Sequence, residues 1–407
     1  MVILFTARRR RSWKPVQGCK NGLAAENPIR NFELSYSMNH NDPELSPTER
    51  ARRRALASLV RLAGTSAALP LAASLAPAAA FGQPPAATAA PATPGPPPRP
   101  APQPGTRVVM LGTHGGPGIE RDRAETSSAV VVDGVPYLVD CGYGSLRQLV
   151  LSTIGYQQLD AIFFTHLHDD HTSDLPALLS HQWTGGAKKT PTEVYGPSGT
   201  ARLVEAALDF LRVNAEIRTV DEGRTIDPAT LFHGHDIAAT AAPTRVLADD
   251  RVTVTAVESA HYPARSTDKM PHRALSYRFD TKERSVVFTG DTAYSENIVG
   301  LAKGADLFVS EVMAQSVYDA NIARAKEAEA AGNTVSIARH VAETHSTPAD
   351  VGRMAAKAKV KTVVLYHLLP GPRQPGGLDY AITNFTDGVR AAGFTGEVIV
   401  SQDLMVL

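Results

Sequence analysis

The chain has 407 residues, of which 43% are hydrophobic, so it can bury a large core and wholesale disorder is excluded. Two cysteines are too few for a disulfide framework or a Cys-rich zinc site. The net charge of zero conceals two unlike regions. Residues 1–106 hold 13 basic and 5 acidic side chains, a net of +8, and residues 107–407 hold 28 basic and 36 acidic side chains, a net of −8. A basic leader therefore precedes an acidic domain.

Residues 1–82 are typical of an N-terminal extension with an export signal. Three arginines at 52–54 precede an uncharged stretch, 62–80, that is rich in Ala and Leu and ends in a small-residue site. These are the three parts of a signal peptide, and the arginine pair is typical of the twin-arginine type. We expect cleavage near Ala80, a periplasmic or secreted location, and no stable membrane span in the mature form. An N-terminal anchor is the alternative. The signal lies unusually far from the first residue, which suggests that translation starts at Met38.

The rest of the chain divides into a linker and a domain. Residues 83–106 contain 10 of the 29 prolines, a density that favours an extended spacer. From residue 107 onward, β-rich runs mix with helical stretches, which predicts one α/β domain, 107–407, with sheets covered by helices. Strands are expected at 107–111, 128–140 (a hairpin about Asp133-Gly134), 159–164, 252–257, 274–279, 285–290, 306–312, 361–367 and 396–401, and helices at 175–183, 200–211, 321–332, 349–359 and 380–393.

A cluster of histidines and aspartates, His166-Leu167-His168-Asp169-Asp170-His171, directly follows the expected strand at 159–164. Imidazole and carboxylate are ligands that zinc accepts. In an extended stretch His166 and His168 point to the same side, so they can bind one ion. Asp170 and His171 lie beyond the bend and can face a second ion. The alternative is a solvated, histidine-rich loop.

This cluster and further motifs in the same order resemble the metallo-β-lactamase-fold hydrolases, whose signature is H-x-H-x-D-H after a strand. The matching segments are MLGTHGGP (110–117), LVDCGYG (138–144), His261 after VTVTAVES, FTGDT (288–292) with Asp291, and VVLYH (363–367) with His367. The resemblance covers essentially all of 107–407. It implies an αββα sandwich, with two face-to-face β-sheets flanked by helices and the site at one edge.

The resemblance also implies two metal ions, expected to be Zn²⁺, with Mn²⁺ or Fe as alternatives. The implied ligands are His166, His168 and His261 for the first metal, and Asp170, His171 and His367 for the second, with Asp291 bridging. Such a pair lowers the pKa of a shared water and neutralises charge on the substrate. His272 competes with His261 for the third histidine position, and His261 is favoured because it directly follows its strand.

Other residues have expected roles near this site. Asp140 is expected to orient a liganding histidine, and the alternative is a strand-end turn residue. His345 in THSTP matches a histidine that nuclease-like members use beside the metals, and it would protonate the leaving oxygen; the alternative is a capping-loop histidine. Asp170 and His345 are thus the expected catalytic residues. His340 is expected on a helix surface, and His114 in a turn near the site.

The motifs are most similar to the branch that contains tRNA 3′-processing nucleases, arylsulfatase-like enzymes and cyclic-nucleotide phosphodiesterases. We expect an exported binuclear hydrolase of small anionic phosphate or sulfate esters that acts through a metal-bridging hydroxide. Nucleic acid is disfavoured by the net charge of −8 and by the short segment from Arg278 to Gly290, where bacterial tRNA-processing enzymes carry a long insertion. The alternatives are a tRNA 3′-processing endoribonuclease, a lactone or thioester hydrolase, and a metal-binding scaffold without turnover. The oligomeric state stays open, a homodimer being one option.

Overall fold

The computed structural model describes residues 104–186, 190–369 and 377–407. The expected export signal, the start at Met38 and the linker up to residue 103 lie outside the described residues. None of the helices among the described residues has the length and apolar character needed to cross a membrane.

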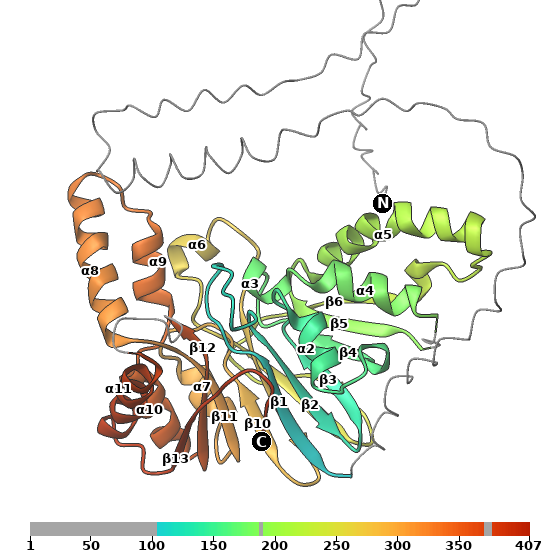
Figure 1. Ribbon diagram of the computed structural model, residues 1–407. Helices are drawn as coiled ribbons and strands as arrows, with labels where there is room; N and C mark the ends of the chain where they lie inside the picture. Colours follow the sequence, from blue (N-terminus) through green and yellow to red (C-terminus); the bar gives the residue numbers. More distant parts are fainter. Residues whose placement is uncertain (1–103, 187–189, 370–376) are drawn as a thin grey trace, which may run out of the picture. The chain divides into compact units, whose positions relative to one another are not determined.

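Two seven-stranded sheets form the centre of the described domain (Figure 1). The first sheet has the order β14 (Met405–Val406), β1 (Thr106–Gly112), β2 (Ser127–Val132), β3 (Val135–Val139), β4 (Ala161–Phe163), β5 (Thr192–Pro197) and β6 (Phe232–Ile237). The second has the order β13 (Glu397–Val400), β12 (Thr362–Leu369), β11 (Leu307–Met313), β10 (Ser285–Phe288), β9 (Leu275–Thr281), β8 (Val252–Glu258) and β7 (Thr244–Ala248). Both sheets mix parallel and antiparallel pairs.

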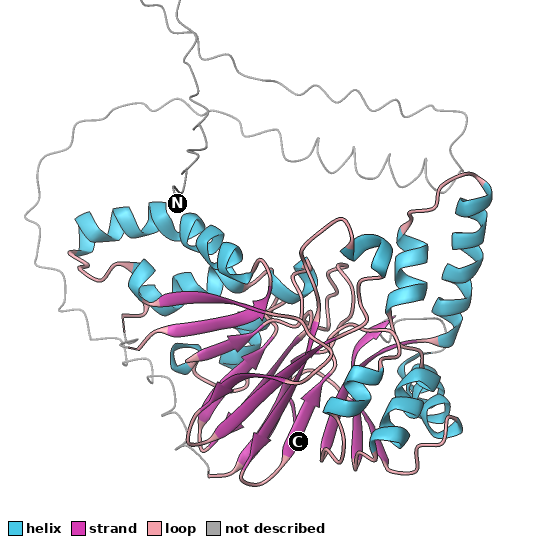
Figure 2. Cartoon of the chain, turned by 180° about the vertical axis from the view of Figure 1, so that it is seen from behind, coloured by secondary structure: helices cyan, strands magenta, loops and turns pink. Residues whose placement is uncertain are grey.

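Helices cover the outer faces of both sheets (Figure 2). The first sheet is covered by α2 (Ser145–Leu151), α4 (Leu175–Thr184) and α5 (Thr200–Glu222), and the second by α7 (Glu296–Leu301), α10 (Pro348–Ala358) and α11 (Gly377–Ala391). The short elements are α3 (Asp169–Thr172), α6 (Ala264–Thr267), η1 (Tyr156–Gln158) and η2 (Pro228–Thr230). The predicted αββα sandwich is confirmed.

A helical hairpin stands beside the second sheet. It consists of α8 (Gln315–Ala330) and α9 (Ile337–Thr344), and in both ribbon views α9 lies between α8 and the rest of the domain. No residue of α8 is buried, whereas α9 buries Ala338, Ala342 and Thr344. The inner helix therefore joins the hairpin to the domain.

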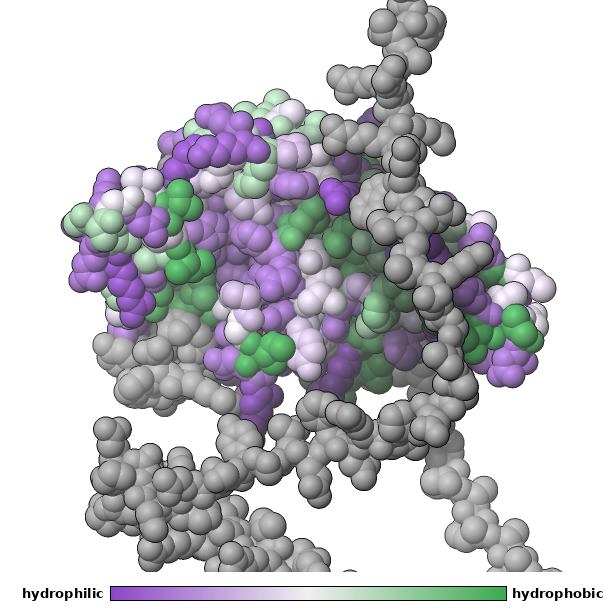
Figure 3. Space-filling view, turned by 90° about the horizontal axis from the view of Figure 1, so that it is seen from above, coloured by the Kyte–Doolittle hydropathy of each residue, from purple (hydrophilic) through white to green (hydrophobic). Residues whose placement is uncertain are grey.

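The core has three layers because alternate side chains of each strand point to opposite faces. On β1, Val108 and Met110 pack between the two sheets, while Val109 and Leu111 pack toward the helices of the first sheet. A third cluster fills the space between the second sheet and its helices. Seen from above, the described surface shows separate hydrophobic patches among hydrophilic side chains (Figure 3).

All the strands expected from hydrophobic runs are present, but four others were not expected: β5, β6, β7 and β14. Strand β6, FHGHDI, lacks an apolar alternation because His233 and His235 bond to Glu193 of β5 on one face. The helix expected to end at 211 continues to Glu222, and the one expected at 321–332 spans Gln315–Ala330.

Candidate metal centre

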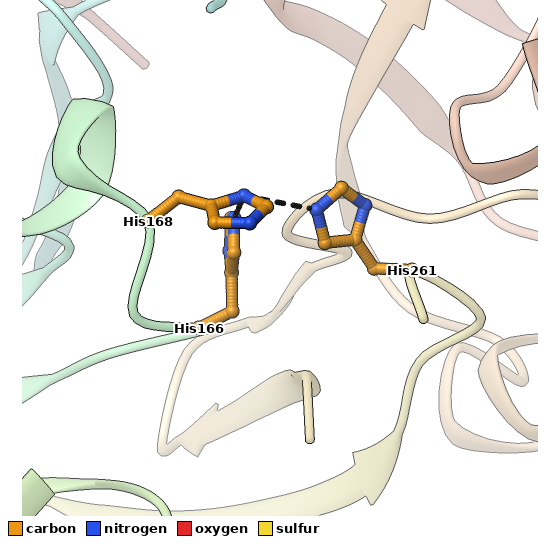
Figure 4. Close-up of side chains that lie close together, drawn as sticks. All are labelled: His166, His168 and His261. Carbon is orange, nitrogen blue, oxygen red and sulfur yellow. Dashed lines mark hydrogen bonds between the residues drawn. The ribbon is translucent and has the colours of Figure 1, made fainter. Parts of the chain in front are cut away.

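Three histidines converge at the end of β4, where the chain leaves the first sheet (Figure 4). His166 follows the strand, and His168 precedes α3. Nε2 of His166 lies 3.0 Å from Nδ1 of His168, and Nε2 of His261, which follows β8, lies 3.2 Å from the same atom. His272 is not in this group, because its Nδ1 donates to the carbonyl of Ser198 at 2.8 Å. The structure therefore places His261, and not its competitor, with the motif histidines.

Neighbouring groups orient two of these rings so that Nε2 faces the centre. The hydroxyl of Thr165 donates to Asp140 at 2.9 Å, so its oxygen accepts from Nδ1 of His166 at 3.2 Å. Nδ1 of His261 donates to the carbonyl of Thr344 at 3.2 Å. Burial lowers the pKa of His166 and of His261 well below the ordinary value. Both rings are therefore neutral and present a lone pair, the form that binds a metal.

A second group lies beside the first and consists of Asp170, His171, Asp291 and His367, all buried. Oδ1 of Asp291 lies 3.4 Å from Nε2 of His171 and 3.2 Å from Nε2 of His367. Nε2 of His171 and Oδ1 of Asp291 have no hydrogen-bond partner in the part of the chain that the structure describes. Buried polar atoms without partners are costly, and a cation between them removes that cost. The donor set thus fits a divalent ion.

Asp291 faces both groups. Its Oδ1 points to the second group, while its Oδ2 lies 3.8 Å from Nε2 of His166 and 4.0 Å from Nε2 of His261. One carboxylate oxygen toward each group is the geometry of a bridging ligand. The seven residues predicted as ligands are therefore brought together as two adjacent groups, consistent with a binuclear site built from histidine and aspartate.

Asp140 lies beneath the second group at the end of β3. Its backbone has φ 59°, a left-handed conformation that is uncommon outside glycine. Its carboxylate accepts from the backbone N–H of Thr165 at 2.8 Å and from Nδ1 of His171 at 2.9 Å. Burial alone lowers the pKa of His171, but the carboxylates of Asp291, Asp170 and Asp140 outweigh it and hold that pKa well above its ordinary value. Asp140 therefore fixes the direction in which Nε2 of His171 points.

A β-bulge aims His367 at the same group. Tyr366 pairs with Glu311 and Leu368 pairs with Val312, so His367 is the extra residue, and its φ is 44°. Positive φ at a residue other than glycine carries strain of the kind found at functional sites.

The opening glycine turn packs directly on this bulge. A Cβ on Gly115 would lie 2.6 Å from Nδ1 of His367 and 2.8 Å from its backbone. The N–H of Gly116 donates to Oδ2 of Asp170 at 3.0 Å. The turn therefore supports one ligand residue by close packing and a second by a hydrogen bond. His114, in the same turn, is buried beside the site and belongs to neither group.

Glu311 is a buried carboxylate beside the site that the sequence analysis missed. It is fully buried on β11, and its Oε1 accepts from the N–H groups of Thr292 and Ser346. Nδ1 of His345 donates to its Oε2 at 2.9 Å. Burial lowers the pKa of His345, but Glu311 and Asp291 raise it to about 9. The sequence offered one sign of this residue, since Glu311 is the single charged side chain in the otherwise uncharged strand LFVSEVM.

The structure corrects the expectation that His340 lies on the surface of a helix. It lies on α9, half-buried, and its ring centroid is 5.0 Å from that of His261 and 5.9 Å from that of His345. Burial lowers its pKa to about 4, with His345 and His168 acting in the same direction. The sequence periodicity of this short helix did not show which face meets the site.

Comparisons with known proteins agree with this geometry. A family model described as the beta-lactamase superfamily domain matches residues 136–368. Ribonuclease Z of Mycobacterium bovis (strain BCG / Pasteur 1173P2) is 28% identical over 73% of this chain and 96% of the relative. Ribonuclease Z of Mycolicibacterium paratuberculosis (strain ATCC BAA-968 / K-10) is 30% identical over 65% of this chain and 86% of the relative.

Solved structures show a similar fold. The metallo-beta-lactamase fold protein YhfI from Bacillus subtilis aligns with a TM-score of 0.51 at 20% identity, over 74% of this chain and 98% of that one. Human tRNase Z, short form, aligns with a TM-score of 0.51 at 23% identity over the same shares. At these sequence identities, the similarity to the solved structures shows a shared fold alone.

Proposed function

Since this chain belongs to the beta-lactamase superfamily, in its ribonuclease Z-like branch, we propose that it is a binuclear metal-dependent phosphodiesterase that acts on RNA. The observation that carries the proposal is the buried pair of His345 and Glu311 beside the bridging Asp291. An alkoxide leaving group, such as the sugar oxygen of RNA, needs a proton from an acid at neutral pH. The pair supplies that acid.

The two groups of ligands would hold the metal ions. Histidine nitrogens and aspartate oxygens suit Zn²⁺, and Mn²⁺ or Fe accept the same donors. When bound, such a pair supplies Lewis-acid stabilisation of the phosphoryl oxygens and lowers the pKa of water. Asp170, the other expected catalytic residue, stays ionised because His171 and His367 outweigh the effect of burial and lower its pKa. Its hydrogen bond from the glycine turn fixes its position.

His345 is placed to protonate the leaving oxygen. Its ring stacks on that of His367 at 5.7 Å and lies 5.2 Å from the ring of His261, so it is adjacent to both groups of ligands. Because Nδ1 is bonded to Glu311, the proton available for the substrate is on Nε2. A ring between the two groups can reach an ester oxygen that leaves from a phosphate held there.

The proposed substrate class differs from the first expectation, which was a small phosphate or sulfate ester with nucleic acid disfavoured. The ribonuclease Z relatives favour the alternative of an RNA substrate, since the matches cover 86–96% of their length. One observation keeps a small phosphodiester as a second candidate. Residues 107–407 carry a net charge of −8, and RNA-binding surfaces are normally basic.

The experiment is a comparison of substrates with the purified, metal-loaded protein. We expect cleavage of a 3′-extended tRNA at one position, and turnover of bis(p-nitrophenyl) phosphate, both abolished by EDTA. An Asp291→Ala variant purified in parallel excludes a contaminating nuclease. Cleavage of the phosphodiester without the tRNA would favour the second candidate. Hydrolysis of p-nitrophenyl sulfate alone would overturn the phosphodiesterase proposal.

We also propose that residues 1–82 export the enzyme, a location that would separate it from cytoplasmic tRNA and therefore favours the second candidate. The support is the basic, apolar and small-residue order of that segment in the sequence. Fractionation of cells that express the full chain tests this proposal, together with N-terminal sequencing of the mature protein. A start before residue 80 in the mature form would contradict cleavage near Ala80.

A further inference from the structure

His340 lies at the site but belongs to neither group of ligands. With His261 and His345 it forms a trio whose nitrogens lie within 4.8 Å of one another, close enough to share an ion, whereas the groups that contain Asp291 do not include it. His261 directs Nδ1 to Thr344 and Nε2 to His168, so its metal-facing nitrogen lies among the motif histidines. His340 keeps part of its surface open, as the ligand histidine His168 does, whereas His166 and His261 are fully buried. That arrangement is suited to contact with a substrate.

The ring of His340 has one free nitrogen. The hydroxyl of Thr344 donates to the carbonyl of His340 at 2.7 Å, and Nδ1 of His340 lies 3.4 Å from the same hydroxyl oxygen. With its proton given to the carbonyl, the hydroxyl can only accept from Nδ1. Nε2 of His340 has no hydrogen-bond partner within the described ranges. In the neutral ring Nε2 then accepts, and the partner that it suits is a hydroxyl.

Ion pairs hold the helix that carries His340 in place. Glu343, one turn further along α9, bonds to Arg339 at 2.7 Å and also to Arg265 of α6. The loop that contains α6 directly follows His261. The pair of Arg265 and Glu343 therefore joins α9 to the loop that follows His261.

The position relative to His345 defines what His340 would touch. If His345 protonates the leaving oxygen, the ring of His340, 5.9 Å from that of His345, is close enough to contact the atoms next to that oxygen. In a ribonucleotide whose 3′ oxygen leaves, the neighbouring carbon carries the 2′-hydroxyl. We propose that His340 accepts a hydrogen bond from a hydroxyl adjacent to the leaving oxygen, so that the enzyme selects ribose over deoxyribose at the cleaved nucleotide. The inference rests on the proposed phosphodiesterase function and adds the sugar preference to it.

A cycle that combines one protein change with one substrate change tests this contact. The substrates are two oligonucleotides that differ by a single 2′-deoxy substitution at the cleaved nucleotide. The proteins are the wild type, His340→Phe, and the control His181→Phe, an exposed histidine on α4 that belongs to neither group of ligands. Metal content and circular dichroism are measured for each protein.

We expect the effects of the two changes on kcat/KM not to add, because each change removes the same hydrogen bond. The 2′-deoxy substitution lowers kcat/KM of the wild type about tenfold, as loss of one hydrogen bond does. His340→Phe lowers kcat/KM for the ribose substrate by a similar factor, has little effect on the deoxy substrate, and keeps two metal ions. His181→Phe behaves as the wild type.

Three outcomes would overturn the inference. Equal losses on both substrates would indicate a structural role, and loss of one metal ion would make His340 a ligand. A wild type that cleaves both oligonucleotides equally, or that hydrolyses only bis(p-nitrophenyl) phosphate, would remove the sugar preference while the phosphodiesterase function stands. A wild type that cleaves none of these substrates would refute the proposed function itself.

Discussion

Nδ1 of His345 donates to Oε2 of Glu311 at 2.9 Å, and both side chains are buried between the ligand groups and β11. A buried carboxylate paired with a histidine favours the protonated ring. In the proposed mechanism, the pair thus couples the acid to a fully buried carboxylate. It also explains why a charged side chain occurs in an otherwise uncharged, buried strand.

The first prediction is a pH dependence that Glu311 controls. Protonated His345 is required for an alkoxide leaving group, so activity is present below its pKa and falls as the pH rises through that value. The folded protein raises this pKa to about 9, and bound dications would push it downward, so the alkaline limb is expected at or below pH 9. In Glu311→Gln the limb moves to lower pH, and kcat/KM at pH 8 falls about tenfold or more.

The measurement is kcat/KM against pH for the wild type and Glu311→Gln. A control substrate with a p-nitrophenolate leaving group, which departs without a proton, should lose much less activity in the variant. An unchanged alkaline limb in Glu311→Gln would contradict the role of this pair.

The second prediction concerns Asp140 and the metal. Asp140→Asn keeps the shape of the side chain but replaces one carboxylate oxygen, so His171 loses the charged partner that orients it. Loss of such a partner costs about 10- to 100-fold in metal affinity. Titration of the metal-free protein with Zn²⁺ should show the weaker binding in one of the two sites. Activity should recover at high Zn²⁺, and wild-type affinity in the variant would show that Asp140 is a turn residue.

The third prediction uses two glycines of the opening turn as a matched pair. In Gly115→Ala the new Cβ would lie 2.6 Å from Nδ1 of His367, so this ligand must move. In Gly118→Ala the new Cβ meets nothing within 4 Å. A displacement of about 1 Å can cost on the order of 10²-fold in rate. We expect that loss, with weaker binding of the second metal, in Gly115→Ala only, as measured by kcat and metal content. Equal effects in both variants would refute the packing argument.

The sequence predicted which residues converge at the site because the expected ligands combine local spacing with recognisable motifs. His166, His168, Asp170 and His171 lie within six residues after a strand, and the remaining ligands each follow a hydrophobic run. Strand ends are rigid, so spacing along the chain translates into position in the structure. The fold class followed from the same motifs.

Glu311 and His340 could not be predicted in that way. Glu311 is 34 residues from His345, and only the parallel pairing of β11 with β12 brings its side chain to the site. His340 is on an eight-residue helix whose apolar residues, Ile337, Ala338, Val341 and Ala342, share one face. It lies among the polar residues of that helix, a position that the pattern assigns to the surface. In both cases the role depends on tertiary packing that the local sequence does not encode.

The last prediction is that metal removal destabilises the fold through the second group of ligands. Without an ion, Oδ1 of Asp291 and Nε2 of His171 remain buried with no hydrogen-bond partner in the described part of the chain. An ion present at about 100 times its dissociation constant adds roughly 2.7 kcal/mol to the free energy of unfolding. For a domain of about 300 residues, that corresponds to a rise in Tm of roughly 4 °C. Differential scanning calorimetry with Zn²⁺ and with EDTA should show this difference in the wild type. It should be much smaller in Asp291→Ala, which lacks the bridging carboxylate, and unchanged in His181→Phe. If EDTA shifts the Tm of Asp291→Ala as much as that of the wild type, the ion responsible binds outside the bridged pair.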